Sequence, residues 1–479
     1  MNATDPIRQH ARSTPDAPAF ILDDRPPLSY ADYDAVLDAI ARRLLDAGVR
    51  PGHSVALAVH RDFALFTLGL ALARIGATGF ASKAPEDPCD FRVVSRGVAP
   101  SPHAPTLQVD KLWFQAPAAG ARGAPLATHQ DGTALFHIFR TSGTTGRAKA
   151  LGLSHDDILS RADRRRRALS LPQPGRAMTK VRPAASYGFQ FLLRVLLEGG
   201  AIVDAPALDD VPGAIGRHRV NYLVMPPGIL SAMIARMPPG IGPFPSLEFV
   251  EISGSRLTDQ LAELAFRRVS PNLITLYGST EAGLIAIGPV RDILGIPGAV
   301  GRLIPGVVVQ IVDDAGNPLP PDTEGTLRLR DDGGHSYYGD SGPATAFRDG
   351  WFYSGDLARL THDGMLVIGG RADQIINVGG GKVAPEKLEH KVLAFPGVAD
   401  VAAFAVPSRT ANIDRVAMAI VIGPGFDFAT FQARCRDELG VFAPETVLRM
   451  DAIPRNENGK INRQDLQALA AAHAAAPAR

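Results

Sequence analysis

The sequence predicts an α/β fold: a large, layered N-terminal α/β domain with parallel sheets and a small β-subdomain, then a small C-terminal α+β domain. Between residues 29 and 280, short apolar runs alternate with stretches of helical periodicity, a pattern typical of parallel sheets covered by helices. The chain has 479 residues, and a single hydrophobic core stops growing well below that length. We therefore expect at least two domains.

Strand and helix signals alternate at the start of the chain. Ser29 and Asp32 have the spacing of a capping box, which predicts the start of a helix. The expected elements are a helix over residues 29–47, a strand over 54–59, a helix over 62–75, and loops with short strands over the proline-rich residues 81–125. Gly48 and Gly76 are the expected stops of the two helices.

The same alternation continues to the C-terminus. The expected elements are a helix over residues 154–169, strands over 201–203, 222–225, 249–252 and 273–276, antiparallel strands between 307 and 329 with a turn at 313–316, helices over 385–393 and 428–439, and strands over 401–406 and 416–422. We place the domain boundary between residues 370 and 371, which gives domains of residues 1–370 and 371–479. The Ala-rich tail from Ala470 is expected to fray.

Charge and cysteine content exclude several classes of protein. The formal net charge is +1, so no overall field attracts nucleic acid or a membrane surface. The two cysteines, Cys89 and Cys435, lie far apart and form neither a disulfide framework nor a metal-type cluster. The first residues do not resemble a signal peptide, and no apolar run is long enough to span a bilayer. We expect a cytoplasmic protein without a nucleic-acid or membrane partner.

A loop rich in glycine and hydroxyl groups follows the apolar run at residues 134–139. Glycines allow a close backbone approach to a ligand, and consecutive N–H groups in such a turn bind anions. The hydroxyls add donors and the lysine adds a cation, so the loop suits a polyphosphate. The expected phosphate-binding residues are Thr141, Ser142, Gly143, Thr144, Thr145, Gly146 and Lys149. The spacing differs from that of a Walker loop, and in isolation a plain surface turn is the favoured interpretation of the segment.

Residues 141–149 resemble the phosphate-binding signature of the adenylate-forming superfamily, which includes acyl- and aryl-CoA synthetases, adenylation domains and firefly luciferase. Ala148 stands where that signature usually has proline. Five segments that resemble the signatures of this superfamily follow one another, in order, from Thr141 to about Leu466. The resemblance implies ATP and Mg²⁺ as ligands and a small C-terminal domain that is mobile.

The second such segment is residues 277–281, directly after the apolar run at 273–276. In open α/β sheets, ligands bind at the carboxyl ends of the strands. We expect Tyr277 to stack on adenine, Thr280 to hold a phosphate or carboxylate oxygen, and Glu281 to bind Mg²⁺, which prefers oxygen ligands. The resemblance also includes Gly278 and Ser279 in the nucleotide site.

The third and fourth segments resemble the ribose site and the junction between the two domains. The resemblance implies that Asp356 accepts the ribose hydroxyls, that Arg371 contacts ribose or phosphate, and that Asp373 is the hinge. Gly254 and Ser255 stand where the superfamily has a turn against the adenine, although Arg256 replaces a frequent proline there.

The last segment places Lys460 on a loop after a glycine, where the resemblance implies a lysine that bridges the acyl carboxylate and the α-phosphate. We expect Thr280, Glu281 and Lys460 to be the catalytic residues. In CoA ligases the stretch that matches Gly379, Gly380 and Gly381 lines the pantetheine tunnel. A plain flexible loop is the alternative for these glycines.

Two further regions bear on the choice of acid and on the distribution of basic residues. Tyr187 and Gly188 stand where many relatives have a gate near the acyl pocket, and residues 184–197 contain no Asp to pair with an α-ammonium group. This absence argues against α-amino acids as substrates, since an unpaired buried ammonium is costly. Arg161 and residues 164–167 form a basic helix, which we expect to be a solvated face; a site for CoA phosphates is the alternative.

Together these features predict ATP-dependent activation of a small-molecule carboxylic acid as an acyl-adenylate, followed by transfer to a thiol. We expect CoA as that thiol, because the sequence shows no carrier domain and the glycine segment suits pantetheine. A stand-alone adenylation enzyme that loads a carrier protein is the close alternative. A non-catalytic nucleotide-binding module is a different class, and Glu281 with Lys460 argues against it. Nothing specific supports a luciferase-like oxygenase.

Overall fold

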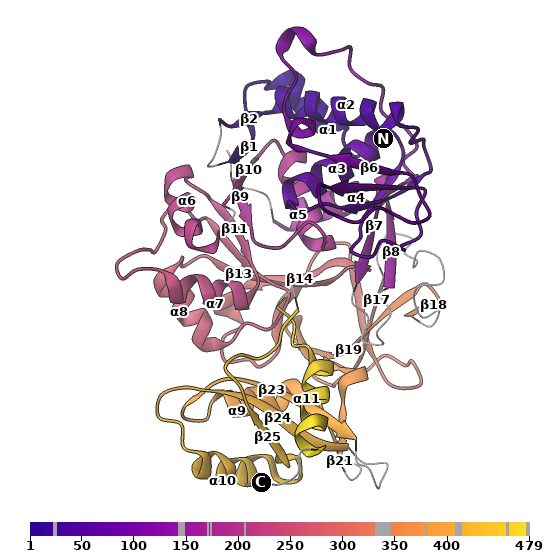
Figure 1. The fold of residues 1–479 in the computed structure, drawn as a ribbon. Helices are drawn as coiled ribbons and strands as arrows, with labels where there is room; N and C mark the ends of the chain where they lie inside the picture. Colours follow the sequence, from indigo (N-terminus) through magenta and orange to yellow (C-terminus); the bar gives the residue numbers. More distant parts are fainter. Residues whose placement is uncertain are drawn as a thin grey trace.

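The computed structural model describes residues 1–22, 26–141, 149–169, 172, 175–205, 207–330, 346–378, 381–407, 414–456 and 459–475. Figure 1 shows a large N-terminal part and a smaller C-terminal part below it. Both parts combine sheets with covering helices, so the predicted α/β fold class is confirmed. None of the helices in these ranges has the length and apolar character needed to cross a membrane.

The first sheet of the large part has the order β6-β5-β3-β4-β7-β8. Its strands are β3 (Ser54–Ala58), β4 (Thr78–Ala81), β5 (Phe91–Ser95), β6 (Thr106–Val109), β7 (Leu135–Thr141) and β8 (Lys149–Ser154). All neighbours in this sheet are parallel except β7 and β8, whose antiparallel pairing ends at Thr141 and Lys149. The predicted phosphate loop therefore joins the two strands of a hairpin.

The second sheet has a parallel half and an antiparallel half. The parallel strands are β1 (Pro18–Leu22), β9 (Arg176–Thr179), β10 (Ala201–Asp204), β11 (Tyr222–Met225), β12 (Phe249–Ile252) and β13 (Leu273–Ser279). At one end of the sheet, β2 (Leu28–Ser29) pairs antiparallel with β1. Beyond β13, the sheet is extended by the antiparallel strands β14 (Gly283–Pro289), β15 (Ala299–Leu303), β16 (Val308–Val312), β17 (Gly325–Arg330), β18 (Phe347–Arg348), β19 (Trp351–Leu360) and β20 (Met365–Arg371).

Helices cover these sheets. They are α1 (Asp5–Ser13), α2 (Tyr30–Asp46), α3 (Asp62–Arg74), α4 (His155–Ala168), α5 (Ser186–Leu197), α6 (Val211–His218), α7 (Pro227–Arg236) and α8 (Asp259–Arg268). The predicted cap is present, because the Ser29 hydroxyl accepts a hydrogen bond from the Asp32 N–H at 3.1 Å. Every residue of α3 from Ala64 to Arg74 is buried, as expected for a helix that is apolar on all sides and lies inside the core.

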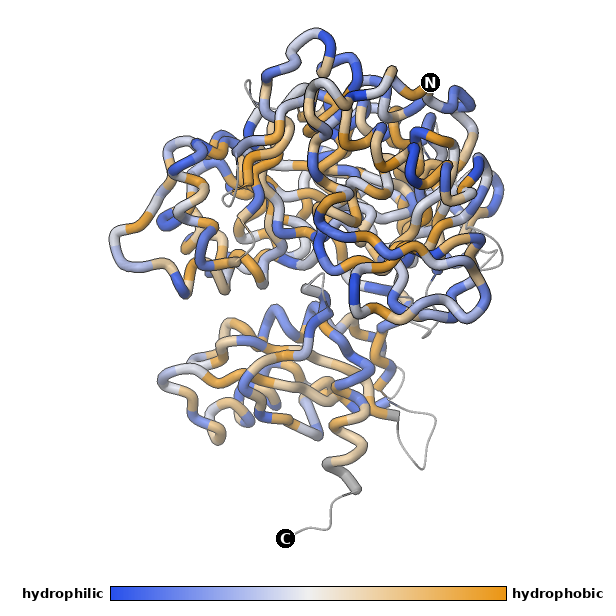
Figure 2. Tube along the Cα trace, turned by 45° about the horizontal axis from the view of Figure 1, so that its top comes forward, coloured by the Kyte–Doolittle hydropathy of each residue, from blue (hydrophilic) through white to orange (hydrophobic). Residues whose placement is uncertain are grey.

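The C-terminal part has two small sheets, β21-β22 and β23-β24-β25, and its own cores. Its strands are β21 (Ile376–Val378), β22 (Gly381–Val383), β23 (Val398–Pro407), β24 (Asp414–Ile422) and β25 (Thr446–Arg449), and its helices are α9 (Pro385–Leu393), α10 (Phe428–Leu439) and α11 (Arg463–Ala475). Strands β23 and β24 are antiparallel, and β25 runs parallel to β24. Figure 2 shows apolar segments running through the interior of both parts.

The expectation that the tail frays from Ala470 is wrong for the residues that the structure describes. Helix α11 continues to Ala475. Leu466 is fully buried and Ala470 is 3% exposed, because both pack with Phe404 and Ala417 of the β23–β24 hairpin. The alanine content alone therefore gave the wrong prediction, since burial of one helix face stabilises the segment.

Candidate active site

The predicted segment at residues 277–281 lies at the carboxyl end of a parallel strand. Strand β13 extends to Ser279, three residues further than predicted, because β14 folds back and pairs with it. Tyr277, Gly278 and Ser279 are thus the last strand residues, and Thr280 and Glu281 lie in the tight turn to β14. The Ala282 N–H donates to the Ser279 hydroxyl at 3.1 Å, which helps to close this turn.

Tyr277, Asp356 and Arg371 meet although they come from three different segments. The Tyr277 hydroxyl donates a hydrogen bond to Asp356 Oδ2, and Arg371 Nη1 lies 3.3 Å from Asp356 Oδ1. Desolvation by burial, together with the negative charge of Asp356, raises the pKa of Tyr277 well above its ordinary value, so the hydroxyl stays protonated and remains a donor. Strands β19 and β20 pair antiparallel, with Asp356 opposite Arg371.

Arg371 also binds the predicted hinge residue. Its Nε and Nη2 atoms lie 3.1 and 3.0 Å from the two carboxylate oxygens of Asp373, and its Nη1 donates to the Ser354 carbonyl at 2.7 Å. Asp373 lies in a short 3₁₀ helix directly after β20. The junction between the two parts of the chain is therefore connected to Asp356 through one guanidinium group.

The Lys460 loop lies against the Ser255 turn. A Cβ built on Gly459 would be 3.7 Å from Pro226 Cβ and 3.9 Å from Ser255 Oγ. Gly459 has a positive φ of 77° and its N–H donates to the Asn456 carbonyl, which turns the loop. The Lys460 side chain is exposed. The backbone N–H of Lys460 donates to Asn456 Oδ1 at 3.0 Å. Gly459, the residue before Lys460, thus lies beside the segment predicted to contact adenine.

Three polar contacts join α9 to the large part. Arg256 donates to the Glu386 carbonyl at 3.3 Å and lies 2.8 Å from His390 Nδ1. Lys387 Nζ lies 2.9 Å from Glu324. Arg256, which departs from the superfamily pattern, therefore contacts the C-terminal part in this arrangement.

The Gly254 turn carries a buried polar atom that suits a ligand. Gly254, two residues after the end of β12, has a positive φ of 94°. The preceding Ser253 is 7% exposed, and its hydroxyl has no hydrogen-bond partner among the described residues. A buried hydroxyl of this kind can donate to a ligand or accept a hydrogen bond from one.

The structure describes the predicted phosphate and thiol segments only in part. The backbones of Thr141 and Lys149 are placed at the ends of β7 and β8, whereas Ser142, Gly143, Thr144, Thr145 and Gly146 lie outside the described residues. Gly379 and Gly380 also lie outside them. Gly381 begins β22, and a Cβ there would be 3.0 Å from the Phe442 ring.

Tyr187 and Gly188 lie at the first turn of α5, beside α4. A Cβ at Gly188 would be 2.4 Å from the Arg182 carbonyl oxygen, so the close backbone approach requires glycine. The Tyr187 hydroxyl is buried without a hydrogen-bond partner among the described residues. The Arg165 guanidinium carbon lies 5.4 Å from the centre of the Tyr187 ring.

The prediction that the basic helix is a solvated face is wrong for its inward side. Arg161, Arg164 and Arg165 are buried. Arg165 pairs with both oxygens of Glu251, which is fully buried on β12. Arg166 and Arg167 are exposed and pair with Asp163, as expected for a solvated face.

Sequence reasoning missed Glu251 and placed Arg161 on a solvated face. Arg161 donates to the carbonyls of Thr280 and Glu281, and Glu251 accepts a hydrogen bond from the Tyr222 hydroxyl as well as from Arg165. The available signal was a single carboxyl group inside an apolar strand together with an arginine-rich helix. A buried charge needs a partner, so these two features predict each other.

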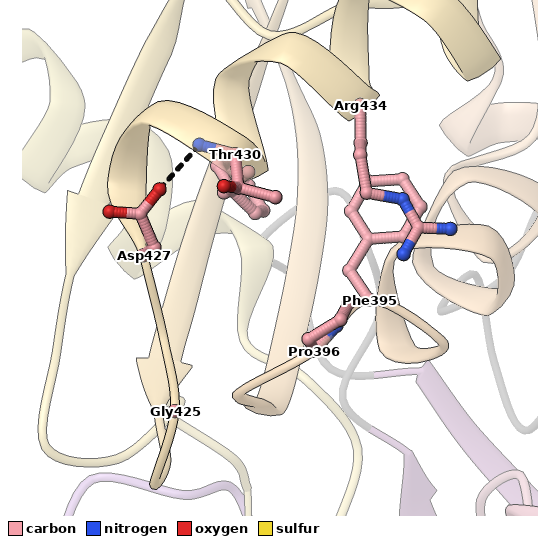
Figure 3. Close-up of a pocket in the computed structure, with 7 residues that line it drawn as sticks. Phe395, Pro396, Gly425, Asp427, Thr430 and Arg434 are labelled. Atoms are coloured by element: carbon pink, nitrogen blue, oxygen red, sulfur yellow. Dashed lines mark hydrogen bonds between the residues drawn. The ribbon is translucent and has the colours of Figure 1, made fainter.

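A small surface pocket in the C-terminal part lies apart from these groups. Figure 3 shows Phe395, Pro396 and Arg434 on one side of it and Asp427 with Thr430 on the other. Asp427 accepts from the Thr430 N–H at 2.7 Å as the cap of α10, and Arg434 lies 4.4 Å from the Phe395 ring centre. The pocket contains none of the predicted site residues, and its side chains have structural partners.

Comparison with known proteins identifies the family. A sequence profile described as AMP-binding enzyme matches residues 7–81 and 91–338. The chain belongs to this family. It is an adenylate-forming enzyme, which uses ATP to activate a carboxylic acid and forms AMP.

Individual relatives are distant in sequence. Novobiocin biosynthesis protein H of Streptomyces niveus is 29% identical, over 95% of this chain and 80% of that protein. The salicylyl-CoA synthase / salicylate adenylyltransferase of a Streptomyces species is 27% identical, over 93% and 90%. The ATP-bound structure of MatB from Rhodopseudomonas palustris has the same fold, with a TM-score of 0.85, 23% identity, and coverage of 98% of this chain and 99% of that one.

Proposed function

We propose that this enzyme is an acid–thiol ligase that joins a small carboxylic acid to CoA in two half-reactions. The observation that carries the proposal is the position of the Lys460 loop beside Ser255, while Asp356 is held by Tyr277 and Arg371. Tyr277, Asp356 and Arg371 supply groups that suit a nucleotide, and the Lys460 loop supplies a cation that suits a developing negative charge.

In the first half-reaction a carboxylate oxygen attacks the α-phosphorus of ATP, and pyrophosphate leaves. Asp356 accepts the ribose hydroxyls, Tyr277 stacks on the adenine, and the Gly254 and Ser255 turn packs against it. The hairpin loop between Thr141 and Lys149 holds the polyphosphate. Lys460 offsets the charge where the carboxylate and the α-phosphate meet.

Glu281 fits Mg²⁺, which proteins commonly hold through one or two carboxylates and substrate phosphates. The described residues contain no group of three or more His, Cys, Asp and Glu side chains arranged for a metal. Such a site suits an ion that the nucleotide itself helps to bind. When bound, Mg²⁺ supplies positive charge to the phosphate oxygens.

In the second half-reaction the thiol sulfur attacks the acyl carbon, AMP leaves, and the thiol proton is released. CoA as the thiol is supported by the likeness to a relative whose name includes a CoA synthase activity. Gly381, against Phe442, stands at the start of the C-terminal part, whereas Lys460 stands near its end. We place the domain boundary between residues 370 and 371 and the hinge at Asp373, so that one rotation presents Lys460 and another presents the glycine segment.

The proposal is tested with a panel of carboxylic acids, ATP and Mg²⁺, scored for pyrophosphate release. Products are then identified by mass spectrometry with free CoA or with phosphopantetheinylated carrier proteins. We expect acid-dependent pyrophosphate release and a CoA thioester. Acyl transfer only to a carrier protein would show that the acceptor is that protein and not CoA. ATP binding without AMP formation would overturn the ligase function.

The metal role of Glu281 is tested by Glu281→Gln, with Glu263→Gln on the surface of α8 as the matched control. We expect the first variant to lose adenylation activity at limiting Mg²⁺ while its thermal unfolding stays unchanged. The control should behave as the wild type, because Glu263 is exposed and pairs only loosely with Arg267, at 3.9 Å. Normal activity of Glu281→Gln at limiting Mg²⁺ would rule out this role.

A further inference from the structure

Helix α4 connects two segments of the proposed site. It begins directly after β8, whose first residue is Lys149 at the end of the phosphate-loop hairpin. A capping box between Ser154 and Asp157 fixes its start. The helix packs against β14, the strand that follows Thr280 and Glu281. Its inward face therefore lies between the phosphate hairpin and the turn that carries both residues.

Arg161 lies on this inward face and is 6% exposed. Its Nη1 donates to the Thr280 carbonyl at 2.8 Å, and its Nη2 donates to the Glu281 carbonyl. Both carbonyls belong to the turn between β13 and β14, outside the strand pairing that ends at Ser279 and Gly283. One planar guanidinium group therefore binds two consecutive peptide groups, which fixes their position and orientation together.

The Arg161 side chain also covers the turn through its aliphatic stem. A Cβ built on Gly283 would be 3.6 Å from Arg161 Cδ and 3.7 Å from Cγ. Arg165, one helical turn later on the same face, binds Glu251 on the neighbouring strand β12. Helix α4 is thus attached to the ends of both β12 and β13, the strands that lead to the Gly254 turn and to Thr280.

We propose that Arg161 is a positioning residue for adenylation, which holds the turn so that Thr280 and Glu281 present their side chains to the metal–nucleotide complex. The inference rests on the roles proposed above for those two residues. Outer groups that orient metal ligands typically contribute about 10- to 100-fold to metal affinity or activity. The sequence alone could not assign this role, because the contact joins residues 119 and 120 positions apart.

The test compares Arg161→Met, which keeps the apolar stem, with Arg161→Lys, which keeps the charge but only one donor nitrogen. Arg167→Met is the matched control. Arg167 is on the same helix but is 56% exposed and pairs with Asp163. The first measurement is the dissociation constant of Mn²⁺ in the presence of ATP, determined by electron paramagnetic resonance. The second is the rate of each half-reaction, with acyl-AMP supplied for the thiol step.

We expect Arg161→Met to weaken Mn²⁺ binding in the ATP complex and to slow adenylation by about 10- to 100-fold, with the thiol step from supplied acyl-AMP retained. Arg161→Lys should restore part of both losses, and Arg167→Met should match the wild type. Wild-type Mn²⁺ affinity in folded Arg161→Met would overturn the inference, as would an equal loss of both half-reactions. If the wild type binds Mn²⁺ and ATP but forms no adenylate, the proposed function fails, and the Mn²⁺ affinities still decide the role of Arg161.

Discussion

The phenol of Tyr277 donates a hydrogen bond to the carboxylate of Asp356, which lies 79 residues later in the chain and also faces Arg371. This contact joins the end of the parallel half of the large sheet to its antiparallel extension. We propose that both side chains bind the nucleoside, Tyr277 through adenine and Asp356 through ribose. The hydrogen bond between them then fixes the orientation of each relative to the other. Tyr277 keeps its proton because burial and the neighbouring Asp356 carboxylate raise the pKa of its hydroxyl.

We predict that Tyr277→Phe raises KM for ATP by about 10-fold or more, since a hydrogen bond to a charged group contributes about 1.5–3 kcal/mol. The ring remains available for stacking, so the effect isolates the hydroxyl. Tyr353→Phe is the control, because the Tyr353 hydroxyl binds Arg328 at 3.0 Å and not Asp356. The KM for ATP of each variant is measured by steady-state kinetics at varied ATP concentration. An unchanged KM in Tyr277→Phe would contradict a role of the Tyr277 hydroxyl in nucleotide binding.

The contact between Arg256 and His390 predicts a pH dependence of adenylation. Desolvation by burial, followed by the Arg256 charge, lowers the pKa of His390 below its ordinary value of 6.5, while Asp259 opposes the shift. Because its pKa is lowered in the folded protein, the neutral form of His390 favours the contact with Arg256. The contact is therefore intact above about pH 6.5 and weakens as the pH falls through the lowered pKa of His390. We expect the adenylation rate to fall on that acidic side.

Arg256→Met tests this reasoning, because it removes the charge that disfavours protonated His390. The pKa of His390, measured by NMR titration, should move upward toward 6.5 in the variant. His390→Gln should remove the acidic decline that belongs to this contact. An identical His390 titration in the wild type and in Arg256→Met would show that the two side chains do not interact in solution.

Tyr187→Phe should change the choice of acid. The Tyr187 hydroxyl is buried without a partner among the described residues, and a buried hydroxyl without a hydrogen bond is costly. An acid with a hydroxyl or amino substituent can supply that bond, and a site built for such a bond discriminates strongly against the analogue that lacks it. We expect the variant to lose at least about 10-fold in kcat/KM for a substituted acid relative to its unsubstituted analogue. Equal ratios in both proteins would assign Tyr187 to packing alone.

Glu251→Gln should destabilise the large part. Glu251 is fully buried, Arg165 is its ion-pair partner, and Tyr222 donates to the same carboxylate. Removing one charge of a buried pair leaves the other uncompensated, which costs about 3–5 kcal/mol in the free energy of unfolding. Denaturant unfolding measures this loss. A change below about 1 kcal/mol, the value typical of exposed pairs, would show that the pair contributes little.

Local signals in the sequence were sufficient for much of the fold. The cap at Ser29 and the stops at Gly48 and Gly76 depend on neighbouring residues only, and the structure has them where they were predicted. The extension of β13 to Ser279 depends on β14, which pairs with it from later in the chain. A strand boundary set by a partner strand is not readable from the strand itself.

The site was predictable where side-chain chemistry repeats a known pattern, and not where it depends on packing. Tyr277, Asp356 and Arg371 were assigned from separate motifs, and the structure brings them into contact. Arg161 and Arg165 looked like part of a solvated charge run, because their partners lie 86 to 120 positions away in the chain. Only the folded arrangement distinguishes them from the exposed Arg166 and Arg167.

The central claim is that Lys460 serves the adenylation step and not the thiol step. The direct measurement is the rate of each half-reaction in Lys460→Ala. The control is Lys111→Ala, because Lys111 is exposed at the start of a short 3₁₀ helix in the large part. We predict that acyl-AMP formation slows by about 10²–10³-fold, the effect of removing one preorganised charge-stabilising group. Thioester formation from supplied acyl-AMP should stay within about 2-fold of the wild type, well below the 10-fold effect expected for each 1.4 kcal/mol of lost transition-state stabilisation. Equal damage to both steps in a folded Lys460→Ala protein would contradict the account.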